Sequence, residues 1–302
     1  MPWICLATLS ESVSGGRKIL AKIAVHSPHH TAIASGEGWS ISDVICSAGP
    51  RDRPYEELHT NPRIAVVASG TFQYRSGRTP DLMAPGSILL GNAGDCFTCG
   101  HEHGIGDRCV SISYEPACFE RIARDAGCAP RFRRSSLPPI RATSPIVARA
   151  VALLVPAEQG SCEEFAIQLA ARVLTLESGI RAENGGGRPA PLARVSRVIR
   201  EIENDPAAPT DLASLARLAR LSPYHFLRTF QVLTGVTPHQ YLLRARLRQA
   251  AVWLLSEKRN IAEIALDCGF GDLSNFNRAF KHEFGMTPRM CRRTSGFRCA
   301  AD

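Results

Sequence analysis

A group of cysteine and histidine residues that could bind a metal ion lies between Asp95 and Cys109. If this segment is a β-strand, the side chains of Cys99, His101 and His103 alternate onto one face, because successive side chains of a strand point to opposite sides. Thiolate and imidazole groups are ligands that Zn²⁺ and other transition-metal ions prefer. The spacing therefore predicts a site for Zn²⁺ or a similar ion, formed by these three side chains.

Other interpretations of this segment remain open. A polar strand end before a turn at residues 104–106 also explains the histidines, and the cysteines then serve as small buried apolar residues. Cys96 and Cys99 are alternatively a pair of thiols that senses oxidants. If a metal is bound, His59 is a further ligand that the fold could supply from elsewhere in the chain.

A second group of polar side chains lies on two segments near the C-terminus. In each segment two phenylalanines four residues apart, Phe226 with Phe230 and Phe276 with Phe280, predict the inward face of a short helix. The side chains predicted to face outward are Tyr224, Leu227, Arg228 and Gln231 in the first segment and Asn275, Asn277, Arg278 and Lys281 in the second. Such side chains bind base edges and phosphates in a major groove, although one helix of this kind could also be a plain solvated hairpin.

An internal repeat argues against the plain hairpin. Six residues, in the order Phe, Arg, Phe, Gly, Thr and Pro, recur at a constant offset of 50 between Phe226–Pro238 and Phe276–Pro288. Each copy is predicted to contain two short helices separated by a tight turn. The predicted N-terminal caps are Asp211 and Ser222 in the first copy, and Asn260 with either Asp272 or Ser274 in the second. A basic amphipathic helix over residues 239–256 is expected to join the copies.

Residues 193–293 resemble the DNA-binding domain of the AraC/XylS-type transcription regulators. The resemblance is carried by Ile261–Ala265, Gly269–Phe270, Asn275–Lys281, Gly285, Thr287–Pro288 and Arg292. Two residues depart from the usual pattern of that family. Cys291 stands in place of an aromatic residue, which alters local packing of the last helix, and Gln231 stands in place of a lysine, which removes one phosphate contact.

The resemblance implies two helix-turn-helix units that insert recognition helices into successive major grooves of promoter DNA. It adds Ser274 to the residues that are expected to read bases. It also implies an N-terminal cupin-like domain for a small-molecule effector or for dimerisation, a homodimer, and RNA polymerase as a partner of an activator. The leading interpretation is thus a transcription regulator without catalytic residues. The alternative is a cupin-type metal- or thiol-dependent enzyme or sensor fused to the DNA-binding domain, with a site at His59, His101 and His103.

The chain that must position these groups divides into two parts. Short β-type runs between Gly36 and Tyr114 predict an antiparallel sandwich or barrel, and helical spacing follows over residues 116–127 and 144–179. The expected fold class is α+β, with an N-terminal cupin-like β-barrel and an all-α C-terminal domain. The segment 181–191, with three glycines and two prolines, predicts a linker between domains at 1–180 and 192–296.

Charge and cysteine content narrow the class of protein further. The net charge is +8, and residues 192–302 hold 17 Lys and Arg against 10 Asp and Glu, so the excess lies beside the repeat and favours a polyanionic partner. Eleven scattered cysteines argue against a secreted disulfide framework and for a cytoplasmic protein. The apolar runs are too short to span a bilayer, so no membrane association is expected.

Overall fold

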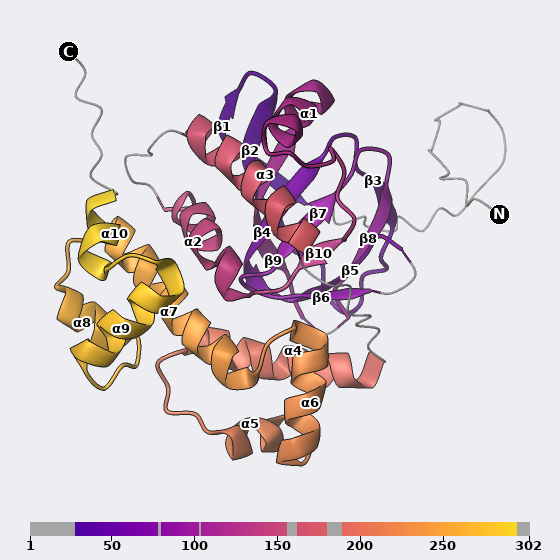
Figure 1. Cartoon of the computed structure of the whole chain (residues 1–302). Coiled ribbons are helices and arrows are strands. Elements are labelled where there is room, and N and C mark those ends of the chain that lie inside the picture. Colours follow the sequence, from indigo (N-terminus) through magenta and orange to yellow (C-terminus); the bar gives the residue numbers. More distant parts are fainter. Residues whose placement is uncertain (1–27, 78–79, 103, 156–161, 180–188, 295–302) are drawn as a thin grey trace.

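The computed structural model describes residues 28–77, 80–102, 104–155, 162–179 and 189–294 (Figure 1). Two β-sheets and their covering helices form the N-terminal part, and helices alone form the C-terminal part. The predicted α+β class is therefore confirmed. The strands lie in a six-stranded and a four-stranded sheet, so the described residues do not form the closed barrel that we expected.

The larger sheet has the strand order β1-β2-β9-β4-β7-β10. Its strands are β1 (His29–Gly36), β2 (Trp39–Cys46), β9 (Asp107–Tyr114), β4 (Arg63–Gly70), β7 (Ile88–Gly91) and β10 (Ser136–Leu137). The smaller sheet, in the order β3-β8-β5-β6, contains β3 (Glu56–Leu58), β8 (Cys96–Gly100), β5 (Phe72–Arg75) and β6 (Asp81–Met83). All pairings are antiparallel.

Strand β4 of the larger sheet is buried on both faces, and strand alternation decides which of its side chains faces which layer. Ile64 and Val66 of β4 face a core that they share with the helices. The alternate residues of β4, Ala65 and Val67, face a second core that they share with Phe72 of the smaller sheet. Burial on both faces explains why this strand is a continuous apolar run rather than an alternating one.

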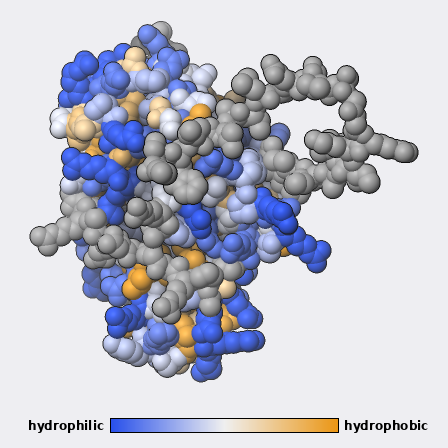
Figure 2. Space-filling model, turned by 90° about the vertical axis from the view of Figure 1, so that its right-hand side faces the viewer, coloured by the Kyte–Doolittle hydropathy of each residue, from blue (hydrophilic) through white to orange (hydrophobic). Residues whose placement is uncertain are grey.

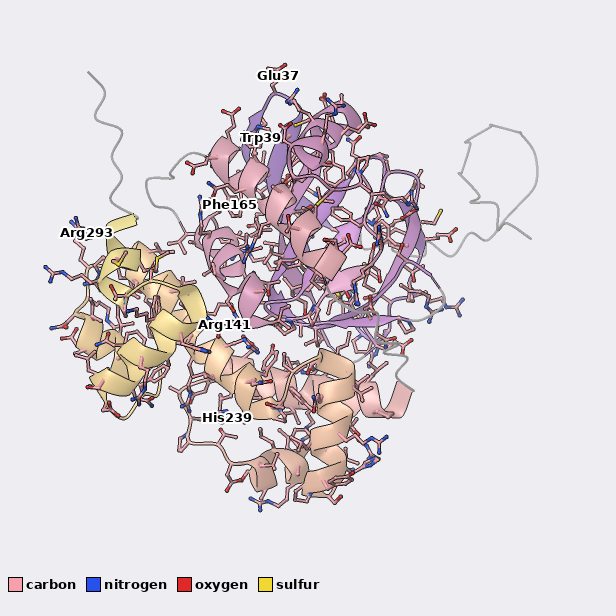
Figure 3. All side chains as sticks on the ribbon, in the orientation of Figure 1. Glu37, Trp39, Arg141, Phe165, His239 and Arg293 are labelled. Atoms are coloured by element: carbon pink, nitrogen blue, oxygen red, sulfur yellow. The ribbon has the colours of Figure 1, made fainter. Side chains whose placement is uncertain are left out.

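Three helices cover the outer face of the larger sheet: α1 (Pro116–Asp125), α2 (Ser144–Ala152) and α3 (Cys162–Gly179) (Figure 1). Phe165 of α3 and Trp39 of β2 belong to the core beneath them (Figure 3). The Tyr114 hydroxyl donates a hydrogen bond of 2.8 Å to the Ala166 carbonyl.

The C-terminal helices match the predicted repeat. They are α4 (Pro189–Asn204), α5 (Leu212–Leu218), α6 (Pro223–Thr234), α7 (Pro238–Ser256), α8 (Ile261–Asp267), α9 (Leu273–Phe284) and α10 (Pro288–Thr294). The side chains of Asp211, Ser222, Asn260 and Asp272 each accept a hydrogen bond from a backbone N–H at the start of a helix. Short polar side chains at these positions therefore define where the helices begin.

The boundary between the two parts stays a prediction, because residues 180–188 lie outside the described residues. Helix α4 begins at Pro189, so the last three residues of the predicted linker are helical. The two parts are in contact, with α7 packed along α2 (Figure 1). No helix in the described ranges has the length and apolar character needed to cross a membrane. Hydrophilic residues cover most of the face shown in Figure 2, where apolar residues form only small patches.

Candidate nucleic-acid interface and ligand cavity

Each helix-turn-helix unit is built around a pair of phenylalanines. The rings of Phe226 and Phe230 in α6 are fully buried and pack edge to face, with centroids 5.6 Å apart. Phe276 and Phe280 in α9 are buried in the same way, with centroids 5.5 Å apart. Because residues four apart share one helix face, burying these rings turns the other faces of α6 and α9 toward solvent.

The turn before each of these helices uses left-handed backbone. Arg220 has a φ of 54° in the first unit, and Gly269 has a φ of 82° at the matching point of the second. Glycine adopts this conformation at little cost, whereas an arginine there is uncommon. The two turns thus follow the same path although their residue types differ.

The structure leaves the predicted base-reading side chains accessible. Eight of the nine are exposed, with Tyr224 at 75%, and Leu227 is half-buried. Within the described ranges, Arg228, Arg278 and Lys281 have no side-chain hydrogen bond or ion pair to another residue. A long cationic side chain that is exposed and unpaired is free to bind a base edge or a phosphate.

Helix α7 differs from the expectation of a basic amphipathic surface. Arg244 pairs with Glu283 of α9 at 2.9 Å, and Arg248 pairs with Glu203 of α4 at 2.5 Å. Arg246 donates hydrogen bonds to the carbonyls of Pro206, Gly269 and Ala208 at 2.6, 2.9 and 3.1 Å. These three arginines are used inside the protein, so the positive charge available to a polyanion is smaller than the sequence suggests.

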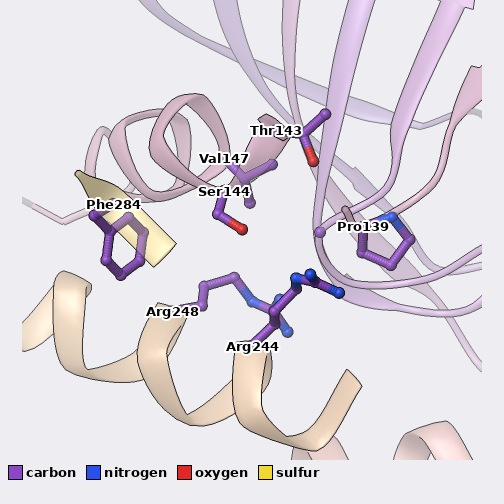
Figure 4. Close-up of a pocket in the computed structure, with 8 residues that line it drawn as sticks. Pro139, Thr143, Ser144, Val147, Arg244, Arg248 and Phe284 are labelled. Atoms are coloured by element: carbon purple, nitrogen blue, oxygen red, sulfur yellow. The ribbon is translucent and has the colours of Figure 1, made fainter. Parts of the chain in front are cut away.

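The same helix also connects the C-terminal part to the sheets. The Tyr241 hydroxyl donates to Glu203 at 2.8 Å and lies 3.3 Å from the carbonyl oxygen of Pro85. Glu283 accepts a hydrogen bond from Ser144 of α2. Figure 4 shows Arg244 and Arg248 extending from α7 toward the segment that contains Pro139, Thr143 and Ser144. Arg141, in the turn before α2, lies 3.2 Å from His282 of α9 and is labelled in Figure 3.

Comparison with known proteins identifies the C-terminal part. A helix-turn-helix domain family matches residues 215–294. The chain is 35% identical over 96 residues to the HTH-type transcriptional activator RhaS of Mannheimia succiniciproducens, which covers 32% of this chain and 36% of that protein. It is 46% identical over 56 residues to the RhaS of Yersinia pestis, a match that covers 18% of this chain and 20% of that protein. The C-terminal part is an AraC-type helix-turn-helix domain.

The chain is also similar to a solved structure of a transcriptional regulator from Chromobacterium violaceum, which is described as an AraC-type DNA-binding domain-containing protein. It is 25% identical, covers 34% of this chain and 93% of its own, and has a TM-score of 0.33. The chain matches only about a third, or less, of the length of these curated relatives. The family match and the relatives concern the C-terminal part, so the N-terminal sheets are interpreted from their own structure.

A cavity of about 930 Å³ lies in the N-terminal part, and residues of both sheets line it. Apolar and aromatic side chains line much of it, together with charged groups that include Arg63 and Glu57. Arg63 donates one hydrogen bond, to Ser111 at 3.1 Å. Burial lowers the pKa of Arg63 and raises that of Glu57. A concave, largely apolar space with a few polar groups is typical of a small-molecule site.

His59 lies in this cavity as a neutral, hydrogen-bonded residue. Its Nε2 is 2.8 Å from the Tyr74 hydroxyl, and its ring stacks on Phe97 with centroids 4.1 Å apart. Burial, assisted by the positive charge of Arg63, lowers the pKa of His59 to about 4. A Cβ at Gly91 would lie 2.4 Å from the imidazole, so only glycine leaves room for this ring.

The predicted metal ligands are only partly brought together. Cys99 and His101 both line the cavity, and Cys99 is a free thiol whose pKa burial raises. His103 lies outside the described residues, so the predicted set of three stays a prediction. His101 contacts Asp107, with Nε2 2.6 Å from Oδ1. Burial acts to lower the pKa of His101, but hydrogen bonds to Asp107 and Cys46 outweigh it and raise the pKa to about 9.

Sequence reasoning therefore missed two residues of this group. Cys46 is the last residue of a strand that was predicted, and Asp107 lies within the cysteine and histidine segment but was not predicted as a ligand. Neither carried a signal of its own, because nothing in the sequence indicated that these two strands are neighbours. Their cross-strand pairing supplies that information.

Proposed function

We propose that this protein is a sequence-specific DNA-binding transcription regulator that reads two successive major grooves. The observation that carries the proposal is the pair of matching helix-turn-helix units whose second helices expose unpaired polar and basic side chains. The RhaS relatives are named as transcriptional activators, which favours activation. An activator acts on transcription at a promoter, so RNA polymerase is a second proposed partner.

The exposed side chains divide into two roles. Arg228 and Arg278 occupy matching positions in α6 and α9, and an arginine can donate two hydrogen bonds to a guanine. The other proposed contacts are the exposed Tyr224, Gln231, Ser274, Asn275 and Asn277 and the half-buried Leu227. Lys281 lies in the last turn of α9 and is proposed to bind phosphate, which positions the helix without reading sequence.

Substitution of either arginine should lower both affinity and specificity. We expect Arg228→Ala and Arg278→Ala each to weaken binding to the specific operator by about 1–3 kcal/mol, roughly 5- to 150-fold, and to relax the preference at one base pair. Each side chain is exposed and unpaired, so neither substitution should disturb folding. Gel-shift titrations with the operator and with single-base variants of it measure both effects.

Lys281→Ala is the matched control for these variants. It should weaken binding to operator and random DNA by the same factor and reduce the salt dependence of binding, because a phosphate contact is the same for every sequence. If both arginine variants also lose equal affinity for operator and random DNA, these arginines contact phosphate and do not read bases.

The N-terminal sheets are proposed to form a cupin-like effector domain. Its cavity of about 930 Å³ is large enough for a small organic molecule. Its contact with α7 supports a route to the DNA-binding units, since Tyr241 and Arg248 pair with Glu203 beside the turn at Pro85. Repeating the gel-shift titrations with candidate small molecules tests this role. An affinity for DNA that no cavity-binding molecule changes would contradict it.

The protein is further proposed to be a homodimer through its N-terminal part, residues 1–180. Two linked DNA-binding domains gain affinity because the second contact becomes intramolecular. Helix α3 exposes Ile167 at 42%, which fits an apolar contact on the outside of the helical layer. Sedimentation at micromolar concentration is expected to show the dimer mass. A monomer both with and without operator DNA would contradict the proposal.

A further inference from the structure

Three side chains that are far apart in the sequence converge at one edge of the cavity. Cys46 ends β2 and Asp107 begins β9, and the two are cross-strand partners in the larger sheet. His101 follows β8 of the smaller sheet. One potential ligand atom of each side chain lies within 4.8 Å of the other two. The convergence results from the way the two sheets meet and not from local spacing.

We propose that Cys46, His101 and Asp107 bind one late first-row transition-metal ion, with Zn²⁺ as the best fit. A thiolate, an imidazole and a carboxylate are ligands that Zn²⁺ accepts together, whereas Mg²⁺ and Ca²⁺ take oxygen ligands. Ligand atoms about 2.0–2.3 Å from one ion lie roughly 3–4 Å apart, so small side-chain rotations suffice. The thiolate and carboxylate charges balance the ion, which lowers the cost of burying it.

Neighbouring groups orient two of the three ligands. The Cys109 thiol donates a hydrogen bond of 3.4 Å to Oδ2 of Asp107, while Oδ1 of the same carboxylate lies 2.6 Å from His101 Nε2. The Phe72 ring stacks on the His101 imidazole with centroids 5.8 Å apart, and His101 is only 4% exposed. Outer groups that fix the orientation of ligands in this way are a general feature of metal sites.

The site also provides a place for a fourth ligand. Zn²⁺ with three protein ligands keeps one position for water or a small molecule. All three side chains line the cavity, so that position is expected to be reachable from it. If the proposed regulatory function holds, an effector with an oxygen or nitrogen donor would bind the ion directly.

The chain between two of the ligands lies beside the DNA-binding part at Gly104. Gly104 lies between His101 and Asp107 in the chain, and a Cβ there would be 3.0 Å from the Thr71 carbonyl and 3.4 Å from Arg200 Nη1. Arg200 belongs to α4, which shares a core with α6. An ion bound by His101 and Asp107 would therefore fix the residues on both sides of a glycine that lies beside Arg200 of α4.

Titration of the reduced, chelator-treated full chain with Co²⁺ alone tests the site. We expect about one Co²⁺ per chain and a thiolate-to-cobalt absorption band, both lost on adding Zn²⁺. Cys46→Ser should abolish the band and weaken Co²⁺ binding more than 100-fold, beyond the roughly 10- to 100-fold typical of losing an outer partner. His101→Gln and Asp107→Asn should weaken binding similarly while leaving a thiolate band at saturating Co²⁺.

Two further cysteine variants distinguish the proposed site from its alternatives. Cys128→Ser removes a free thiol outside the cavity lining and should change nothing. Loss of the band in Cys99→Ser but not in Cys46→Ser would overturn the proposal in favour of Cys99, His101 and His103. Absence of saturable Co²⁺ uptake would overturn it as well and leave His101 and Asp107 as an ion pair.

Circular dichroism of each metal-free variant identifies any that fail to fold. If Cys46→Ser is among them, the His101 and Asp107 variants decide, and unchanged Co²⁺ affinity in both would overturn the proposal. None of these measurements uses DNA, so the metal site can fail while the regulatory function stands, or the reverse. Gel shifts with and without Zn²⁺ then measure the regulatory effect separately.

Discussion

Inserting about five base pairs between the two half-sites of the operator is expected to abolish the specific complex. Helix α7 has 19 residues, so it spans about 28 Å, and it packs against α6 of the first unit and against α8 and α9 of the second. Half a turn of DNA moves the second groove to the opposite side, where a rigidly held α9 cannot reach it. Affinity should fall toward the nonspecific level, on the order of 1,000-fold or more, in a gel-shift titration against random DNA.

The operator for this experiment comes from footprinting of genomic sites. A matched control replaces the same central bases without inserting any, and it should bind normally. An insertion of about ten base pairs restores the face of the DNA but not the distance, so it should also fail. If the half-turn insertion leaves affinity unchanged, only one of the two units reads bases.

Arg246→Met should destabilise the AraC-type domain and separate its two units. The guanidinium donates to Pro206 and Ala208 beside the first unit and to Gly269 in the turn of the second. Removing it leaves three carbonyl groups without their charged donor, and each such bond contributes about 1.5–3 kcal/mol. We expect the free energy of unfolding to fall by roughly 3 kcal/mol, measured by urea denaturation.

Arg217→Met is the control for this loss. Arg217 is exposed, and its guanidinium bonds only the nearby Ser214 hydroxyl at 2.8 Å among the described contacts, so the free energy of unfolding should change by less than about 0.5 kcal/mol. Binding of Arg246→Met to a two-half-site operator should fall more than binding to a single half-site. If Arg246→Met leaves both the free energy of unfolding and the required spacing of the half-sites unchanged, α7 alone fixes the relative position of the two units.

The features that the sequence determined are local or repeated. Asp211, Ser222 and Asn260 cap helices because a short polar side chain bonds a backbone N–H within three residues, and no distant contact is needed. The phenylalanine pairs predict inward faces through helical periodicity alone. The two copies of the repeat support each other's interpretation. The C-terminal helices and their exposed faces could therefore be predicted from the sequence, whereas the packing of the N-terminal layers could not.

Only the tertiary structure decided how distant segments meet. The ladder between β2 and β9 places Cys46 beside Asp107, and the smaller sheet then brings His101 to them, a pairing that no spacing in the sequence encodes. The sequence predicted that Arg246 lies on a basic surface, whereas in the structure its guanidinium donates hydrogen bonds to carbonyl groups of the protein. Helical and capping patterns are set within a few residues, whereas strand register and buried polar partners depend on which segments pack together.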